Sequence, residues 1–399
     1  MSAPSMSIAA LLSAAEFTDI ALRLRPSTST AETIARATWS VLIEPGDRIA
    51  GALIQAHGPI DALRFVWPGG GLCSSEAWER AEISAADLSD AVARWRPRAD
   101  AGAIGEALRG AVEVGASLLF PGDRAWPVGV DDLGAHAPVL LWVRGDPQAL
   151  GAVRPVAIVG ARASTSYGEH VATELAGDLA AGGAVIVSGG AYGIDGAAHR
   201  AALGAGGRTV AFLAGGVDRL YPAGHRQLFG SIQESGAIMS EVPCGGAPTK
   251  WRFLQRNRLI AATGVATVVV EAGRRSGSLN TAAHAAALAR PLGAVPGPVT
   301  SASSAGTHRL MREFDATCVT TAAEVRELWG EQGDSAETVA TQDPDRRRLL
   351  DAMSTRMPLR AEEIARRAGL SFARVSGLLG LLELEEGVSR REGGWVCRG

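Results

Sequence analysis

The 399-residue chain has a single lysine, Lys250, beside 38 arginines, and its four cysteines lie far apart. Cys73, Cys244, Cys318 and Cys397 lack the spacing of metal ligands, and their scarcity is typical of a reducing compartment. No apolar run approaches the roughly 18 residues that a membrane-spanning helix needs. The N-terminus also lacks the basic segment of an export signal. We therefore expect a cytoplasmic protein that neither binds zinc nor spans a membrane.

Motifs of common enzymes are also missing. The chain has no Gly-x-x-x-x-Gly-Lys-Ser/Thr sequence, which argues against the usual ATP-binding loop, and no Gly-x-Ser-x-Gly sequence of serine hydrolases. No pair of side chains stands out as a general acid and a general base. We therefore expect a protein that holds its ligand without converting it, with no cofactor and no metal.

Residues 250–258 read Lys-Trp-Arg-Phe-Leu-Gln-Arg-Asn-Arg, which places four cations and two aromatic rings within nine residues. A groove for single-stranded nucleic acid needs this combination, because cations contact the phosphates while a flat ring stacks on an unpaired base. The alternative is the start of an amphipathic helix with a solvated basic face. The segment by itself is compatible with both interpretations.

The net charge of −3 is distributed unevenly along the chain. Residues 1–150 sum to −6, residues 151–330 to +4, residues 331–344 to −4 and residues 345–399 to +3. A basic centre and a basic C-terminus, joined by an acidic linker over 331–344, are compatible with a polyanionic partner.

Composition also divides the chain into domains. Residues 1–30, rich in Ser, Thr and Ala, are expected to form a flexible extension with one helical stretch near 8–24. Residues 31–115 have helical spacing broken by Glu-Pro-Gly and Gly-Pro turns, which predicts a small α-helical module. Residues 345–399 predict three helices and a hairpin, the outline of a winged helix.

Residues 116–330 alternate short β-rich apolar runs with alanine-rich helical stretches. The expected strands are 156–159, 184–187, 209–213, 237–240, 266–270 and 292–295, and a buried strand over 138–145 leads into them. Strand and helix repeated in this way predict an α/β domain with a doubly wound parallel sheet covered on both faces. In such sheets ligands bind beyond the carboxyl ends of the strands.

Several of the loops at those ends suit anions. The first strand is followed by Gly160-Ala-Arg162, and an arginine at a helix N-terminus holds a phosphate or pairs with a nearby acid. The second is followed by Ser188-Gly189-Gly190, whose glycines let backbone amides approach an anion, and by Asp195, expected to cap the next helix. Ser276-Gly277-Ser278 offers hydroxyls and amides for another phosphate. Several such loops at one edge predict a chain of phosphates.

Together these motifs resemble the DNA-processing protein A (DprA/Smf) family. The chain has the family's Gly-x-Arg turn, its Ser-Gly-Gly-Ala-x-Gly-Ile-Asp loop at 188–195, its Phe-x-x-Arg-Asn-Arg segment at 253–258, its Ser-Gly-Ser turn and a Gly-Thr-His at 306–308. Leu254 and His308 replace the family's usual proline and asparagine. Residues 33–65 resemble the family's SAM-like helical module, and 345–399 resemble its winged-helix domain.

The resemblance implies an extended Rossmann-like domain with no enzymatic activity. It implies a protein that binds single-stranded DNA, dimerises through its sheet domain and helps to load the RecA recombinase during natural transformation and recombination. At the matching positions, Arg162 and Lys250 would hold phosphates and Phe253 would stack on a base. Gly189 and Gly190 would give room and amides.

Three residues of the basic segment have other expected roles. Asn257 would orient the segment, whereas Arg256 and Arg258 would either contact phosphates or form internal pairs that shape the pocket. In the winged-helix domain, the predicted third helix at 372–385 has one cation, Arg374, where a helix that reads a major groove needs several basic and amide side chains. We therefore expect a weak duplex contact or a protein contact there.

The alternative function is a nucleotide-processing enzyme on a similar sheet, like the phosphoribohydrolases of the lonely-guy family. Those enzymes need a Pro-Gly-Gly-x-Gly-Thr-x-x-Glu run that places a carboxylate at the sugar. The nearest counterpart here, residues 271–278, begins with Glu271 and has no acid after it.

Overall fold

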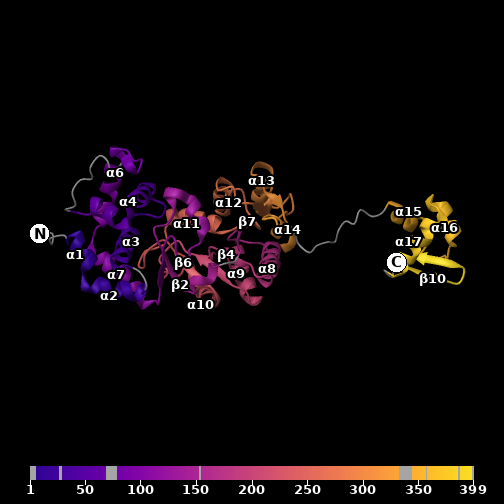
Figure 1. Cartoon of the computed structure of the whole chain (residues 1–399), viewed down its shortest axis with the longest axis horizontal. Coiled ribbons are helices and arrows are strands. Elements are labelled where there is room, and N and C mark those ends of the chain that lie inside the picture. Colours follow the sequence, from indigo (N-terminus) through magenta and orange to yellow (C-terminus); the bar gives the residue numbers. More distant parts are fainter. Residues whose placement is uncertain are drawn as a thin grey trace. The chain divides into compact units, whose positions relative to one another are not determined.

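The computed structural model describes residues 6–26, 29–68, 79–151, 154–331, 344–355, 357–384 and 387–397. The chain divides into two compact units, residues 1–331 and 332–399 (Figure 1). The expected acidic linker, apart from its two end residues, and Cys73 lie outside the described residues. Within the described part, no helix is long and apolar enough to cross a membrane.

A nine-stranded sheet forms the centre of the first unit, in the order β1-β2-β6-β5-β4-β3-β7-β8-β9. The predicted strands are confirmed as β3 to β8, which are parallel to one another. β2 pairs antiparallel with β6, and β1 with β2, so one edge of the sheet is antiparallel. The strands are β1 (Ser117–Leu119), β2 (Leu141–Gly145), β3 (Pro155–Val159), β4 (Val185–Ser188), β5 (Thr209–Phe212), β6 (Ala237–Ser240), β7 (Ala266–Val269), β8 (Leu292–Ala294) and β9 (Thr317–Cys318).

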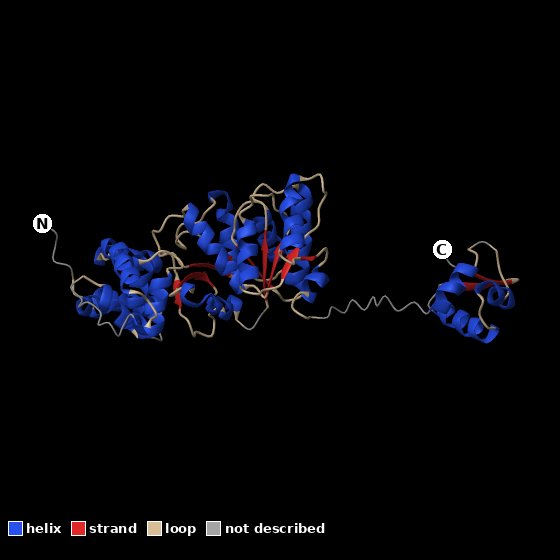
Figure 2. Ribbon diagram, turned by 90° about the horizontal axis from the view of Figure 1, so that it is seen from above, coloured by secondary structure: helices blue, strands red, loops and turns tan. Residues whose placement is uncertain are grey.

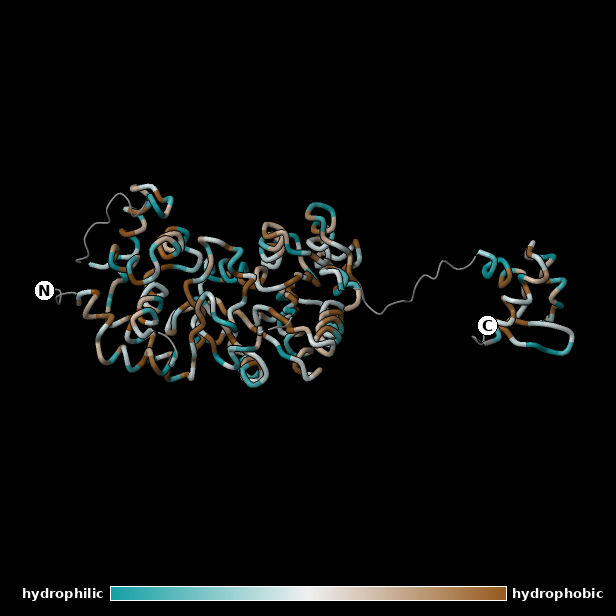
Figure 3. The backbone as a smooth tube through the Cα atoms, in the orientation of Figure 1, coloured by the Kyte–Doolittle hydropathy of each residue, from teal (hydrophilic) through white to brown (hydrophobic). Residues whose placement is uncertain are grey.

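Helices cover both faces of this sheet (Figures 1 and 2). One face packs against α8 (Ser166–Ala181), α9 (Ile194–Gly204), α10 (Arg226–Ser235) and α14 (Ala322–Glu327). The other packs against α11 (Lys250–Thr263), α12 (Ser278–Ala287) and α13 (Ala305–Glu313). Successive residues of a strand point to opposite faces of the sheet. Ile158 of β3 therefore packs in the core with α8 and α9, whereas Ala157 packs in the core with α11 and α12. Burial on both faces explains the continuous apolar runs in the sequence (Figure 3).

The predicted helical module precedes the sheet. It consists of α1 (Ile8–Ser13), α2 (Ala15–Leu24), α3 (Thr30–Leu42), α4 (Arg48–Val66), α6 (Ala85–Trp95) and α7 (Ala101–Glu113). Short 3-10 helices η1 (Arg96–Arg98), η2 (Val128–His136), η3 (Pro147–Leu150), η4 (Ala223–His225) and η5 (Ala302–Ser304) connect elements of the unit. α4 bends at Gly58, whose φ is +76°, as the Gly-Pro pair there predicts.

The expectation of a flexible N-terminal extension is wrong for residues 8–24. α1 and α2 pack against α3, and α2 also packs against α7. Leu11, Phe17 and Leu24 are buried in the resulting core. The Ser-, Thr- and Ala-rich composition concealed an apolar helical face, which stabilises these helices through tertiary packing.

The helical module and the sheet share one hydrophobic core, so they form a single unit where the sequence indicated two domains. Trp39 of α3 and Leu108 of α7 belong to the same buried cluster as Trp142 of β2 and Phe229 of α10. Trp39 also stacks edge-on against Trp95, with ring centroids 5.4 Å apart. From the antiparallel edge of the sheet, β1 and β2 contribute Leu118 and Trp142 to this shared core.

The second unit is the predicted winged helix. Its elements are α15 (Pro344–Ala352), α16 (Ala361–Ala368), α17 (Phe372–Leu384), β10 (Val388–Arg391) and β11 (Gly394–Cys397). The two strands form an antiparallel hairpin, and Leu359 pairs with Trp395 of β11 in an isolated antiparallel bridge. Arg374, the one cation on α17, donates to Asp345 at 3.0 Å. The exposed side of α17 is otherwise made mainly of apolar and small residues, among them Phe372 and Leu381.

Candidate nucleic-acid interface

A cleft of about 600 Å³ opens at the carboxyl ends of β3 and β7. These two strands are neighbours where the winding of the sheet reverses, because β4, β5 and β6 follow on one side of β3 while β7 and β8 lie on the other. Ligands of doubly wound sheets bind at this position. The walls are residues 160–163 after β3, residues 273–278 after β7 and the first turns of α11.

The cleft brings together most of the residues predicted from the sequence. Those that line it are Arg162, Phe253, Arg256, Asn257, Ser276, Gly277 and Ser278. Lys250 is exposed at the first position of α11, one helical turn before Phe253. Ser188, Gly189, Gly190 and Arg258 lie outside the lining, in buried positions behind it.

Arg162 is exposed at the mouth of the cleft, and its guanidinium lies 4.9 Å from the centroid of the Phe253 ring. No carboxylate among the described residues pairs with Arg162, so the alternative of an internal ion pair does not apply to it. The guanidinium keeps its hydrogen-bond donors for an external group. A cation stacked on a half-buried ring provides both a phosphate contact and an aromatic surface.

The first turn of α11 is arranged to attract anions. Thr249 caps the helix by accepting from the Arg252 amide at 3.2 Å, and no acidic residue follows in the first turn. Lys250 therefore adds its charge to the positive end of the helix dipole, which is unfavourable for the isolated helix and favourable for a bound anion. Leu254, where the family has proline, keeps its backbone N–H and lines the cleft.

Arg256 is buried and braces the loops beneath the cleft. Its Nη1 donates to the carbonyl oxygens of Gly189 at 2.7 Å and Phe212 at 2.5 Å. Burial lowers the pKa of Arg256 to about 10, and the neighbouring Asp195 opposes that shift. Asp195 accepts from the amides of Gly189 and Ala191, and, contrary to expectation, it does not cap α9. Arg256 thus forms internal contacts, one of the two roles left open by the sequence.

Arg258 has the same internal character. It donates to Glu241 at 2.5 Å, and both side chains are buried. The Glu241 carboxylate also accepts from the amide of Gly46 at 3.2 Å, in the turn between α3 and α4. Arg258 therefore joins α11 to the helical module and has no donor at the cleft.

The turn at 188–190 supports the cleft from below. Ser188 Oγ donates to the carbonyl oxygen of Ile158 at 2.6 Å, and the Gly189 amide donates to Asp195. The expectation that the Gly189 amide meets a phosphate is therefore wrong, because that donor is already used. Gly190 has a φ of +66°, and a Cβ there would lie 2.5 Å from the Phe229 ring, so the turn requires glycine.

The turn at 276–278 forms the opposite wall. Gly277 precedes α12, and the first amides of this helix donate within the turn: that of Ser278 to the Ser276 hydroxyl at 3.4 Å, and that of Leu279 to the Ser276 carbonyl at 3.2 Å. The hydroxyls of Ser276 and Ser278 lie 2.8 Å apart. Asn257 Nδ2 donates to the Gly277 carbonyl at 3.4 Å, which ties α11 to this wall as its expected orienting role requires.

Sequence reasoning missed one residue of the site, Tyr221. Tyr221 is half exposed and packs edge-on against Phe253, with ring centroids 5.6 Å apart. It follows β5 and therefore belongs to a strand-end loop, which is the signal that would have found it. Arg275 also lines the cleft and is exposed, beside the predicted turn at 276–278.

The carboxylates near the cleft are fixed by internal hydrogen bonds. Glu271, the nearest counterpart of a phosphoribohydrolase acid, is buried and accepts from the amide and the hydroxyl of Thr165, at 2.9 and 2.7 Å. These contacts anchor the start of α8. Asp195, which does line the cleft, accepts from two amides and lies within the electrostatic influence of Arg256. The geometry therefore gives no support to a carboxylate acting on a bound sugar.

Comparison with known proteins agrees with this geometry. The model of the DNA recombination-mediator protein A family matches residues 117–330, more than half of the chain. The chain belongs to this family. The DprA winged helix domain model matches residues 333–394. The first match begins at β1 and covers the whole cleft, and the second falls within the C-terminal unit.

Individual members of the DprA family give the same result. The chain is 42% identical over 383 residues to the DNA processing protein DprA of Mycobacterium tuberculosis, which covers 90% of this chain and 93% of that protein. It is 32% identical over 234 residues to DprA of Bacillus subtilis, covering 59% and 77%. The X-ray structure of DprA from Streptococcus pneumoniae aligns with a TM-score of 0.59 at 28% identity, covering 74% of this chain and 96% of that one. The resemblance found in the sequence is confirmed.

Proposed function

We propose that this DprA-family protein binds single-stranded DNA in the cleft at the carboxyl ends of β3 and β7. The observation that carries the proposal is the contact of the Arg162 guanidinium with the Phe253 ring, at 4.9 Å, at the mouth of that cleft. Lys250 and Arg275 add exposed cations on two of its sides. Bases of a duplex are already stacked on one another, so this arrangement of ring and cations favours an unpaired strand.

The experiment is a fluorescence-anisotropy titration of a labelled oligothymidine at several salt concentrations. The double variant Arg162→Ala/Lys250→Ala should bind more weakly, and its log–log salt slope should fall by about 0.7 for each phosphate that the protein no longer neutralises. Phe253→Ala should weaken binding with little change in slope, because a stacking interaction releases no counterion.

A matched control is Arg208→Ala. Arg208 is exposed and immediately precedes β5 at the opposite edge of the sheet, so its removal takes away one positive charge far from the cleft. Parental affinity and slope are expected for it. Parental binding by both cleft variants would exclude the cleft as the binding site.

We further propose that the protein acts in natural transformation and recombination by helping to load the RecA recombinase onto the bound strand, as a homodimer. The family's description as a recombination mediator supports this role. Light scattering coupled to size-exclusion chromatography, with and without oligonucleotide, tests the dimer. Filament formation by RecA on strands covered with a single-strand-binding protein tests the loading.

An enzymatic role is tested directly by incubating the protein with AMP. We expect no free adenine, because Glu271 and Asp195 are both fixed by internal hydrogen bonds. If adenine were released in proportion to the protein concentration, the protein would be an enzyme as well as a DNA-binding protein.

A further inference from the structure

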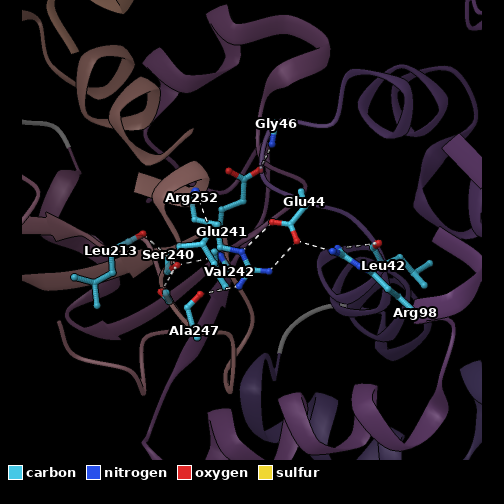
Figure 4. A network of polar contacts seen from close by, with 12 residues as sticks. Leu42, Glu44, Gly46, Arg98, Leu213, Ser240, Glu241, Val242, Ala247 and Arg252 are labelled. Carbon is cyan, nitrogen blue, oxygen red and sulfur yellow. Dashed lines mark hydrogen bonds and ion pairs between the residues drawn. The ribbon is translucent and has the colours of Figure 1, made fainter. Parts of the chain in front are cut away.

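The turn between α3 and α4 is fastened to the first turn of α11 by an ion pair (Figure 4). Both oxygens of Glu44 accept from Arg252: Oε2 lies 2.9 Å from Nε, and Oε1 lies 2.9 Å from Nη2. Arg98 approaches the same carboxylate from the helical module, with its Nη2 at 2.7 Å from Oε1. A bidentate contact of this kind fixes direction as well as distance.

This pair is partly shielded from solvent, since the Arg252 side chain is 18% exposed and that of Glu44 33%. Burial acts to raise the pKa of Glu44, but the hydrogen bonds and charges of Arg252 and Arg98 outweigh it and lower the pKa. Glu44 is therefore ionised at neutral pH. Arg252 also donates its Nη1 to the carbonyl oxygen of Ala247 at 2.9 Å, so it braces the loop that leads into α11.

A second contact joins the turn between α3 and α4 to α11, nearly two helical turns further along this helix, at Arg258. Gly46, with a φ of +78°, donates its amide to Glu241, which in turn accepts from Arg258. A Cβ on Gly46 would lie 2.6 Å from the side-chain oxygen of Gln255. The turn at 44–46 thus lies directly against two successive turns of the helix that forms one wall of the cleft.

The position of Arg252 connects the contact between the turn at 44–46 and α11 to the cleft. It stands between Lys250 and Phe253 in the first turn of α11, where the helix places cations and no acid of its own near the positive end of the dipole. Such a turn is unstable by its own sequence. Glu44 supplies the missing negative charge from outside the helix.

We propose that Glu44 is a positioning residue for single-stranded DNA binding: through Arg252 it holds the first turn of α11 so that Lys250 and Phe253 stay aligned with Arg162. The inference rests on the proposed function, because it concerns the same cleft. Glu44 itself touches no DNA. The helical module thereby contributes to binding through the rigidity of α11.

The direction in which Glu44→Gln changes the DNA affinity distinguishes a positioning role from a purely electrostatic effect of the carboxylate. Removing a negative charge near a polyanion site should strengthen binding if only the field matters. If Glu44 positions the helix, Glu44→Gln should weaken binding by about tenfold, the size of a strong coupling between neighbouring groups. The salt slope should stay parental, because every phosphate keeps its cation.

The matched control is Asp61→Asn. Asp61 lies in the same helical module and also pairs with an arginine, Arg64, at 2.8 Å, but both side chains are more than half exposed and the pair lies within α4. The two variants change the charge equally. Asp61→Asn should bind like the parent, and hydrogen exchange at residues 250–254 should accelerate in Glu44→Gln alone.

A double-mutant cycle completes the test. Arg252→Gln removes the same pair from the other side, so the double variant with Glu44→Gln should bind no more weakly than Arg252→Gln alone. If Glu44→Gln is unfolded, Glu44→Asp replaces it, which keeps the charge but shortens the reach, and parental affinity for it would overturn the proposal.

The outcomes distinguish the two levels of inference. Equal or tighter binding by Glu44→Gln, together with weak binding by Arg162→Ala/Lys250→Ala, would overturn the positioning role and leave the proposed function intact. No binding of single-stranded DNA by the parent would overturn the proposed function itself.

Discussion

The guanidinium of Arg162, in the loop after β3, lies 4.9 Å from the centroid of the Phe253 ring on α11. Because the cation holds the ring and the ring orients the cation, the two should act jointly on a bound strand. Arg162→Ala and Phe253→Ala should each weaken oligothymidine binding, and the double variant should lose about 1 kcal/mol less than the sum of the two. Anisotropy titrations of all four proteins measure this coupling.

Additivity within about 0.3 kcal/mol would mean that the two side chains contact the strand independently. Arg162→Lys gives a useful comparison, because it keeps the charge and loses the planar fork that stacks on a ring. Its affinity should fall between those of the parent and Arg162→Ala.

Tyr221 is expected to extend the aromatic surface beside Phe253. Its ring is half exposed and meets Phe253 edge-on, with centroids 5.6 Å apart. Tyr221→Ala should weaken binding by about 1–2 kcal/mol at unchanged salt slope, the range for the removal of one stacking ring. Tyr221→Phe should bind like the parent, since the ring and not the hydroxyl does the stacking. Equal weakening by both substitutions would assign the effect to the hydroxyl.

Arg256 is expected to contribute to the stability of the fold and not to contact a phosphate of the DNA. It is buried, donates to two carbonyl oxygens and faces Asp195. Arg256→Met leaves two carbonyl oxygens without their donor and Asp195 without a nearby cation, and should lower the free energy of unfolding by about 3 kcal/mol. Urea denaturation followed by tryptophan fluorescence measures the loss. The DNA affinity of the folded variant should fall without the slope change expected of a phosphate contact, and a reduced slope would place Arg256 on the strand.

The stability of the sheet should depend on pH through His199. This side chain is buried against Thr209, and burial, together with the charges of His225, Arg256 and Arg200, lowers its pKa to about 3. Below pH 6.5 the imidazole of His199 is protonated in the unfolded chain, whereas in the folded protein it stays neutral until the pH approaches 3. The free energy of unfolding should therefore fall on acidification, by up to about 1.4 kcal/mol per pH unit, until the folded pKa is reached.

The variant His199→Gln isolates this contribution, because glutamine keeps a hydrogen-bonding side chain but does not titrate. Urea midpoints between about pH 4.5 and 7.5, a window that lies on both sides of the unfolded pKa, should fall more steeply for the parent than for the variant. Tryptophan fluorescence reports the relevant unit, since eight of the nine tryptophans precede residue 332. Parallel profiles would show that His199 is protonated, or exposed, in the folded state.

The sequence predicted the sheet and the position of the cleft because both follow from local pattern. Continuous apolar runs marked β3 to β8, and loops at carboxyl ends of parallel strands meet at one edge whatever lies between them. Arg162 and Phe253 could therefore be assigned to one site. Their direct stacking could not, because it depends on the path of the loop before α11.

Burial was the quantity that the sequence could not supply. Arg256 and Arg258 follow Phe253 in the same basic run, yet both turn inward to Gly189, Phe212 and Glu241. The sequence of a basic segment does not indicate which of its cations will bind a carbonyl oxygen or a carboxylate from a distant part of the chain. The same limit applies to Glu44, whose partner Arg252 comes from another domain of the sequence and became visible only in the fold.

The C-terminal winged helix should be dispensable for binding single-stranded DNA. The cleft lies wholly within residues 1–331, a compact unit with its own cores, and α17 has a single cation that is paired with Asp345. A chain ending at Glu331 should therefore bind oligothymidine within about twofold of the parent, as expected for an independent domain. The same titration on a duplex should show that only the full chain retains a weak contact, to which exposed Arg390 and Arg391 contribute. A large loss of single-strand affinity on truncation would mean that the second unit completes the site.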